Sequence, residues 1–247
     1  MGRRLKERRT PHRWAADISV VLREALGDER FPIDVEDVSR EISKQLFPDD
    51  PITMVRGGDL PGFEGGLVPA PSGKSGWGII YNNAVSSIGR KNFTLAHEFG
   101  HYLIHRLDYP QGFQCTTEDL VSWESEYLAL EREANTFAAN LLMPLDDFRS
   151  RLDPSTRTSL DQIGDCAEHY QVSLLAATLR WLEYTYTTSV MVVSREDFIL
   201  WARSSNNALK KGLYFKTKNR PPIEIPRQSV AHSSTSTRSG WQKTYKK

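Results

Sequence analysis

The stretch FTLAHEFGHYLIH, residues 93–105, places three of the chain's six histidines at intervals of four residues. Helix positions four residues apart lie on one face, so His97 and His101 can direct their rings at one ion. Glu98 follows His97 directly, where it can reach a water at the site without being a ligand. This is the H-E-x-x-H pattern, in which two histidines bind zinc and the glutamate acts as general base. His105 lies about 12 Å from His97 along the axis, too far to share the ion, so we expect it to support the site or to be partly exposed.

The residues around these histidines give the segment an apolar face, which is typical of a buried helix. Gly100 lies within this face, although glycine costs about 1 kcal/mol of helix propensity relative to alanine. A glycine at that position predicts that another segment packs closely against the helix backbone. The alternative is a core helix whose two histidines only form hydrogen bonds inside the protein. The apolar face consists of Phe93, Ala96, Gly100, Leu103 and Ile104.

A third ligand is needed, because a catalytic zinc usually has three protein ligands and one open position. The segment LEREANTFAANLLMP, residues 130–144, offers Glu131 and Glu133 on a second predicted helix with an apolar face. Two residues apart on a helix, these side chains point about 200° away from each other, so only one can face the histidines. Periodicity leaves the choice between them open. A further alternative is that both are solvated, and that only the alanines of this segment matter, because they let a partner helix approach.

The composition of the chain excludes several classes of protein. It has 247 residues, a formal net charge of +1 and an isoelectric point near 7.8. This charge balance gives no overall electrostatic attraction to nucleic acid or to an anionic membrane. No apolar run approaches the roughly 20 residues that a membrane span requires. The basic N-terminus is not followed by a signal-peptide core. The two cysteines, Cys115 and Cys166, lie far apart, which argues against a disulfide framework and fits a reducing cytoplasm.

The remaining segments predict an α+β fold in which helices surround a short mixed sheet. WGIIYN, residues 77–82, is the clearest strand, because it combines β-branched and aromatic residues between glycine and asparagine. The basic residues 1–13 and the polar stretch after about residue 227 are expected to be disordered tails. Helices are further predicted within 14–27 and 34–47, the former capped at its end by Gly27 and the latter at its start by Asp34, and as a pair over 159–185; strands are predicted in 52–55, 66–68, 189–194 and 198–205.

Two of these segments together resemble a known family. NFTLAHEFGHYLIH, followed about thirty residues later by EREANTFAANLLMP, is similar to the ImmA/IrrE family of bacterial zinc metallopeptidases, and the preceding strand GIIYNN also fits. The resemblance implies one zinc ion bound by His97, His101 and the glutamate directly before Ala-Asn, which is Glu133. It implies Glu98 as the base and leaves Glu131 as the reserve ligand.

The resemblance also implies a domain organisation. A thermolysin-like minimal zincin core would occupy residues 14–156, with a sheet edge that could accept an extended peptide. Residues 157–187 resemble a helix-turn-helix-like segment, but its second helix offers only Arg180 near its start. We therefore expect a structural helical pair without direct DNA binding. Residues 188–247 resemble the beginning of a sensor-like (GAF-type) module that is only partial here.

The implied function is a cytoplasmic zinc-dependent endopeptidase that cleaves a specific regulatory protein, such as an Xre-like or phage-type repressor. The alternatives are a zinc-binding regulator that acts by protein or DNA contact without cleavage, and a general peptidase. Glu98 would take a proton from the attacking water and return it to the leaving amine. Tyr81, Tyr102 and His169 are candidates for stabilising the oxyanion, and the sequence assigns none of them.

Overall fold

The computed structural model describes residues 9–114, 125–217 and 219–228, and these form two compact units. The N-terminal unit contains the described residues up to Phe148 together with Cys166–Ser173. The C-terminal unit contains Arg149–Asp165 and the described residues from Leu174 onward. Helices and small sheets are both present, so the α+β class predicted from the sequence is confirmed. No helix within these described ranges is long and apolar enough to cross a membrane.

The N-terminal unit begins with two helices whose first turns are capped by side chains. Thr10 accepts a hydrogen bond from the backbone N–H of Arg13 at the start of α1 (Pro11–Leu26). Asp34 does the same for Asp37 at the start of α2 (Val35–Leu46), as the sequence predicted. The structure starts α1 at Pro11, so the last three residues of the predicted N-terminal tail are helical; proline is favoured in a first turn. Residues 1–8 and 229–247, which make up most of the two predicted tails, lie outside the described residues.

A four-stranded mixed sheet follows in the order β1-β3-β2-β4. β3 pairs with β1 in parallel and with β2 in antiparallel fashion, while β4 extends the sheet on the outer side of β2. Leu67 of β2 lies opposite Ile79 of β3, and both side chains are fully buried, so the middle of the sheet forms part of the core. The strands are β1 (Ile52–Gly58), β2 (Gly65–Pro69), β3 (Trp77–Asn82) and β4 (Phe113–Gln114).

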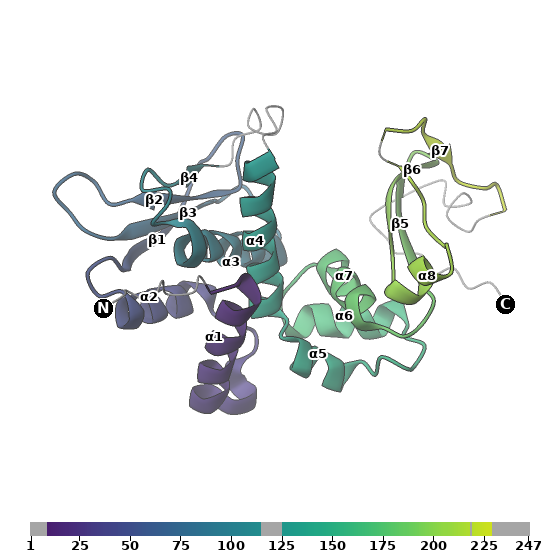
Figure 1. Ribbon diagram of the computed structural model, residues 1–247, viewed down its shortest axis with the longest axis horizontal. Helices are drawn as coiled ribbons and strands as arrows, with labels where there is room; N and C mark the ends of the chain where they lie inside the picture. Colours follow the sequence, from purple (N-terminus) through teal and green to yellow (C-terminus); the bar gives the residue numbers. More distant parts are fainter. Residues whose placement is uncertain (1–8, 115–124, 218, 229–247) are drawn as a thin grey trace, which may run out of the picture. The chain divides into compact units, whose positions relative to one another are not determined.

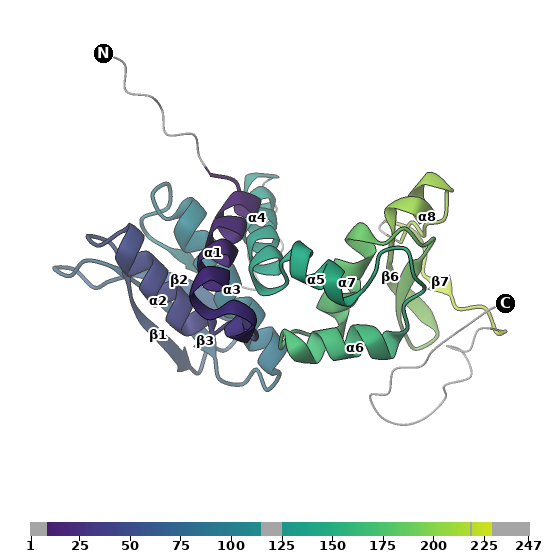
Figure 2. The same cartoon turned by 90° about the horizontal axis from the view of Figure 1, so that it is seen from below.

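Two long helices, α3 (Ile88–His105) and α4 (Ser125–Leu142), lie side by side next to this sheet (Figures 1 and 2). α3 packs on β2 and β3, and α1 packs on α4. The close approach of β2 to α3 depends on Gly65, because a Cβ atom there would lie 2.4 Å from the Cγ2 atom of Thr94. The sheet, α3 and α4 therefore bring the residues of the two sequence motifs into one layer.

The C-terminal unit combines short helices with a three-stranded sheet in the order β5-β6-β7. The hairpin predicted from the sequence is β5 (Val190–Arg195) and β6 (Phe198–Ser204), and its two turn residues, Glu196 and Asp197, both have positive φ. The predicted helical pair corresponds to α6 (Leu160–His169) and α7 (Leu174–Tyr184). The other elements of the chain are α5 (Leu145–Arg151), α8 (Asn206–Lys210), β7 (Ile223–Glu224) and a 3-10 turn at Gly27–Arg30.

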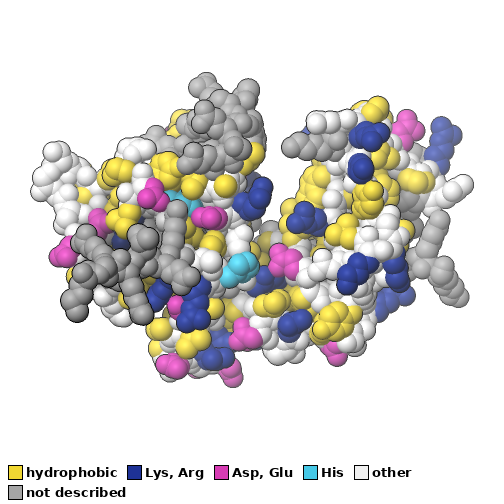
Figure 3. Space-filling model, in the orientation of Figure 1, with side chains coloured by type: hydrophobic (Ala, Val, Ile, Leu, Met, Phe, Trp, Pro, Cys, Tyr) yellow, Lys and Arg dark blue, Asp and Glu magenta, His cyan; other side chains and the backbone are white. Residues whose placement is uncertain are grey.

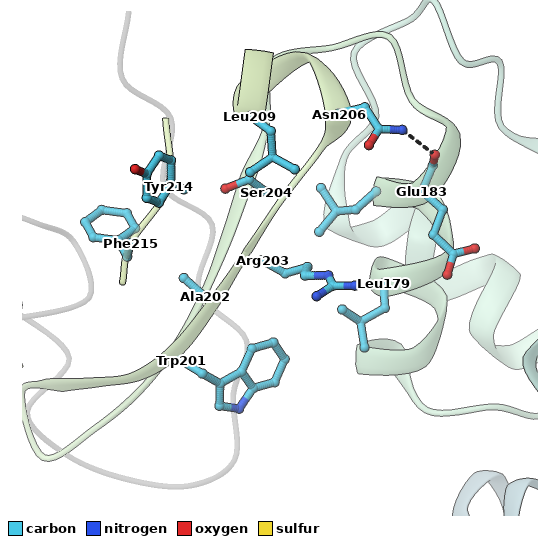
Figure 4. Close-up of a pocket in the computed structure, with 11 residues that line it drawn as sticks. Leu179, Glu183, Trp201, Ala202, Arg203, Ser204, Asn206, Leu209, Tyr214 and Phe215 are labelled. Carbon is cyan, nitrogen blue, oxygen red and sulfur yellow. Dashed lines mark hydrogen bonds between the residues drawn. The ribbon is translucent and has the colours of Figure 1, made fainter. Parts of the chain in front are cut away.

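A cavity of about 640 Å³ lies between α7, β6 and the segment after α8. Figure 4 shows Trp201 and Arg203 of β6 beside Leu179 of α7, with Tyr214 and Phe215 farther along the cavity. Asn206 donates a hydrogen bond to the carbonyl of Glu183 at its edge. Several hydrophobic side chains of this unit are exposed, among them Leu200, Leu209, Leu213, Tyr214 and Phe215.

Candidate metal centre

α3 carries the three histidines along a stripe that winds slowly around the helix. A step of four residues turns a helix by about 40° beyond a full turn, so His105 is rotated by roughly 80° from His97. The Nε2 atoms of His97 and His101 are 3.0 Å apart, and the Nδ1 atoms of His101 and His105 are 3.1 Å apart. The two histidines of the motif thus face one point, as the sequence predicted, while His105 faces the back of His101.

α4 supplies a carboxylate to the same point. The Oε2 atom of Glu131 lies 3.2 Å from Nε2 of His97, and its Oε1 atom lies 3.2 Å from Nε2 of His101. The ligand atoms of these three side chains all lie within 4.8 Å of one another, a spacing that one metal ion can bridge. We call His97, His101 and Glu131 the inner cluster.

The two helices come close enough for this because of small side chains at their contact. A Cβ atom on Gly100 would lie 3.0 Å from the Cδ1 atom of Phe137 and 3.3 Å from the Cα atom of Ala134. Ala134, Phe137 and Ala138 are fully buried. The close packing that the sequence predicted at Gly100 is therefore confirmed, and its partner is α4.

The structure places Glu133 beside His105 and apart from the inner cluster. The resemblance suggested that Glu133 would face His97 and His101, but its Oε2 atom lies 2.9 Å from Nε2 of His105 instead. Glu131 and Glu133 lie on opposite edges of the apolar face of α4, and the edge with Glu131 is the one that meets the motif histidines. The winding of the histidine stripe explains the second contact, because it turns His105 toward the edge with Glu133. We call His105 and Glu133 the outer pair.

A second polar contact marks the edge of α4 that faces the histidines. The Oδ1 atom of Asn135, one turn after Glu131, lies 3.0 Å from Nδ1 of His97. The sequence pattern alone assigned no role to Asn135. The signal was present, because Glu131 and Asn135 are four residues apart and share a helix face, whereas Glu133 does not share that face.

The ring nitrogens that face the inner cluster are suited to a cation. If Nδ1 of His97 donates its hydrogen to Asn135, its Nε2 atom carries a lone pair. The Nε2 atom of His97 lies within about hydrogen-bond distance of two other groups, the Nε2 atom of His101 and the carboxylate of Glu131. Acceptor atoms that converge in this way repel one another unless a proton or a metal ion lies among them. Two imidazoles and one carboxylate form a donor set that fits zinc with one open position.

The pKa values in the cluster reflect burial and this crowding of charge. Burial lowers the pKa of His101 to about 4. Burial also acts to lower the pKa of His97, but the hydrogen bond to Glu131 and the charges of Glu98 and Glu131 outweigh it and raise the pKa above its ordinary value. Burial acts to raise the pKa of Glu131, whereas its close contacts with His101 and His97 hold it well below its usual range. The site is therefore negative and draws a proton toward His97 in the absence of a metal.

Glu98 lies behind the cluster, almost completely buried, with 4% of its surface exposed. Burial raises its pKa to about 7, opposed by the charge of His97 and increased by the charge of Glu131. Its Oε2 atom is buried and has no hydrogen-bond partner within the described residues. A Cβ atom on Gly65 would lie 3.3 Å from its Oε1 atom, so β2 passes directly over the carboxylate. A buried carboxyl group with an unused oxygen and a pKa near 7 is poised to exchange a proton with a bound molecule.

The three side chains of the inner cluster differ in how much of their surface is exposed to solvent. The side chain of His97 is 12% exposed and that of Glu131 is 20% exposed, while His101 is almost fully buried. Figure 3 shows histidine surface between acidic and hydrophobic side chains on the N-terminal unit. The ring of Phe113 in β4 stacks on His101, with centroids 4.2 Å apart and planes inclined by 26°. The sequence did not point to Phe113, because nothing in its local pattern shows that its ring packs on the motif helix.

The three candidates for oxyanion stabilisation have other contacts. The hydroxyl group of Tyr102 donates to the backbone carbonyl of Asp50 at 2.6 Å, and the Tyr102 side chain is fully buried. The ammonium group of Lys91 lies 4.4 Å above the ring of Tyr81. His169 packs against Phe31 and Tyr170. Within the part of the chain that the structure describes, the contacts given for these three side chains do not reach the inner cluster.

Comparisons with known proteins identify the region around the site. A peptidase-family sequence model described as the IrrE N-terminal-like domain matches residues 55–182, which include the inner cluster and Glu98. No curated protein matches the chain with statistical significance. A solved structure described as a Mycobacterium tuberculosis transcriptional regulator is similar over 80% of this chain, with a TM-score of 0.45 and 16% sequence identity. The chain covers 61% of the length of that protein.

Proposed function

The chain belongs to the IrrE N-terminal-like domain family of peptidases, and from this membership and the inner cluster we propose that it is a zinc-dependent endopeptidase. The observation that carries the proposal is the convergence of two imidazole nitrogens and the Glu131 carboxylate beside the buried Glu98. His97 and His101 would bind the ion through Nε2, and Glu131 would be the third ligand in place of Glu133. We further infer that the α3–α4 pair and the mixed sheet form a thermolysin-like core.

The roles of the side chains follow from their positions. A zinc ion held by His97, His101 and Glu131 would provide Lewis acidity, which would polarise a peptide carbonyl and make water more acidic. Glu98 takes a proton from the attacking water and delivers it to the leaving amine. A pKa near 7 suits this exchange, since the carboxyl group can then hold either form close to neutral pH. Glu131 and the two histidines keep the ion beside Glu98, and Gly65 leaves the space that the carboxylate occupies.

The substrate we propose is a regulatory protein of the helix-turn-helix repressor type, cleaved at a specific bond. This part of the proposal rests on the resemblance of the two motifs to the ImmA/IrrE family. A pair of helices, α6 and α7, follows the metal centre, and we propose that it has a structural role. Only Arg180 is basic in the first two turns of α7, and it is buried and paired with Glu183. A DNA-reading helix needs exposed polar or basic side chains there.

The test combines metal content with cleavage. The purified protein should contain about one zinc ion per chain, measured by mass spectrometry of the metal. Glu98→Gln preserves shape but removes the base, so zinc content should stay unchanged while cleavage falls by about 10²-fold or more. Candidate repressors and a panel of unrelated unfolded proteins would be incubated with the wild-type protein and with Glu98→Gln. The products would be analysed by mass spectrometry. Cleavage by Glu98→Gln at the wild-type rate would contradict the mechanism, whereas zinc binding without cleavage of any candidate would point to a non-cleaving regulator.

A further inference from the structure

The outer pair lies directly behind one of the proposed zinc ligands. His105 is completely buried, and its two ring nitrogens have different neighbours. Its Nδ1 atom lies 3.1 Å from Nδ1 of His101, and its Nε2 atom lies 2.9 Å from the Oε2 atom of Glu133. Three side chains from two helices thus form a continuous row from a partly exposed carboxylate to the inner cluster. The proposed catalytic mechanism uses neither His105 nor Glu133.

The hydrogens of this row can be placed from hydrogen-bond chemistry. A metal ion on Nε2 of His101 leaves the hydrogen of that ring on Nδ1, where it can only be donated. The nearest acceptor is Nδ1 of His105, which must then carry a lone pair. The hydrogen of His105 is consequently on Nε2, and the carboxylate of Glu133 accepts it. Within the described row, each donor then faces an acceptor, and no two hydrogens or lone pairs are opposed.

From this arrangement we propose that His105 and Glu133 are positioning residues, which act as a hydrogen-bond relay that holds His101 in the tautomer whose Nε2 lone pair faces the metal. The inference rests on the proposed zinc site and extends it with a role for two residues that bind no metal. Carboxylates and carbonyls commonly orient a metal-binding histidine directly. Here a second histidine lies between the carboxylate and the ligand, because Glu133 is on the edge of α4 that does not reach His101.

The two zinc-binding histidines would then be oriented by different means. His97 is held through Nδ1 by the amide oxygen of Asn135, on the same edge of α4 as Glu131. His101 is more deeply buried and is held through the relay, while Phe113 stacks on its ring. Burial makes an unpaired Nδ1–H group costly. Removal of the His105 acceptor should therefore favour the opposite tautomer of His101, in which Nε2 holds the hydrogen and cannot bind the ion.

The experiment compares His105→Leu with His105→Asn in the full chain. Leucine removes the acceptor, whereas the asparagine amide oxygen can occupy the position of Nδ1 and accept the same hydrogen. Zinc affinity, measured by competition with a chromogenic chelator, should fall by about 10–100-fold for His105→Leu. It should recover most of that loss for His105→Asn. A long-range ¹H–¹⁵N correlation spectrum of the metal-free protein should show His101 protonated on Nδ1 in the wild type and on Nε2 in His105→Leu.

A second variant keeps the test decisive if His105→Leu does not fold. Glu133 has 44% of its side chain exposed, so Glu133→Ala should fold and lower zinc affinity by about 10-fold. Glu41→Ala, at an exposed position of α2, is the matched control and should change nothing. The relay would be overturned if the wild-type protein bound zinc and yet, in its metal-free form, had His101 protonated on Nε2. Unchanged zinc affinity in both His105→Leu and Glu133→Ala would also overturn it. Absence of zinc binding by the wild type would overturn the proposed metal site itself.

Discussion

The inner cluster and the outer pair are built from the same residue types on the same two helices, yet their geometry differs. In the inner cluster, two histidines and Glu131 direct their ligand atoms at one point. In the outer pair, one histidine and Glu133 form a single contact of 2.9 Å, and the carboxylate is partly exposed. Two glutamates only two residues apart therefore have different surroundings, because helix rotation sends them to opposite edges of α4. Convergence of donor atoms, rather than residue type, distinguishes a candidate metal site from a supporting contact.

Removal of each glutamate separately is the most direct test of the difference between the inner cluster and the outer pair. Glu131→Ala deletes one of three proposed ligands and should lower zinc affinity by at least about 10³-fold, well beyond the loss that a supporting residue causes. Glu133→Ala should lower it by only about 10-fold and should keep measurable cleavage. Chelator competition and a cleavage assay with the same substrate measure both effects. If Glu133→Ala lost zinc and Glu131→Ala retained it, the assignment from the motif resemblance would be right and the one from geometry wrong.

The sequence could predict much of the inner cluster, because its signal is local. The spacing of His97, Glu98 and His101 fixes their arrangement on one helix, whatever the rest of the chain does. The choice between Glu131 and Glu133 depends on how α4 is rotated against α3, which is set by packing at Gly100 and Ala134. Periodicity gives both glutamates the same angular distance from the apolar face, so it could not decide between them. The i, i+4 relation of Glu131 to Asn135 carried the missing information.

The elements of the fold also differ in whether neighbouring residues or distant segments determine them. The cap at Asp34, the strand at 77–82 and the hairpin at 190–204 could be predicted, because each depends on neighbouring residues. The order β1-β3-β2-β4 and the stacking of Phe113 on His101 could not, since they depend on pairing between segments far apart in the sequence.

A change in pH should distinguish Glu98, which lies behind the inner cluster, from the outer pair in the metal-free protein. The pKa of buried Glu98 is raised to about 7 from 4.5, so this group stabilises the folded protein fully below about pH 4.5. That contribution is lost as the pH rises through about 7, because the folded protein then holds a buried charge. The loss should amount to roughly 2–3 kcal/mol. Urea unfolding of metal-free wild type and Glu98→Gln at pH 4.5, 6 and 8 measures it as the difference between the two proteins.

The control for this titration is Glu133→Gln, which changes the carboxylate of the outer pair. Its unfolding free energy should keep the wild-type dependence on pH over the same interval, since Glu98 is still present. The result that counts against a buried, protonated Glu98 is a constant difference in unfolding free energy between wild type and Glu98→Gln from pH 4.5 to 8.

The smallest effect is expected where the two helices touch, and it should alter the inner cluster and the outer pair together. In Gly100→Ala, the new methyl group would lie 3.0–3.3 Å from Phe137 and Ala134, so α4 must move by a few tenths of an ångström. Metal–ligand distances tolerate only about 0.2 Å, and zinc affinity should fall by several-fold but less than 10-fold. Stability should change by no more than about 1 kcal/mol, because the gain in helix propensity offsets the overpacking. Gly164→Ala in α6 is the matched control, since its Cβ atom would meet nothing within 4 Å; it should gain stability without any change in zinc affinity. If both alanine variants behaved alike, with more stability and unaltered zinc binding, the spacing of α3 and α4 would not be what sets the geometry of the metal centre.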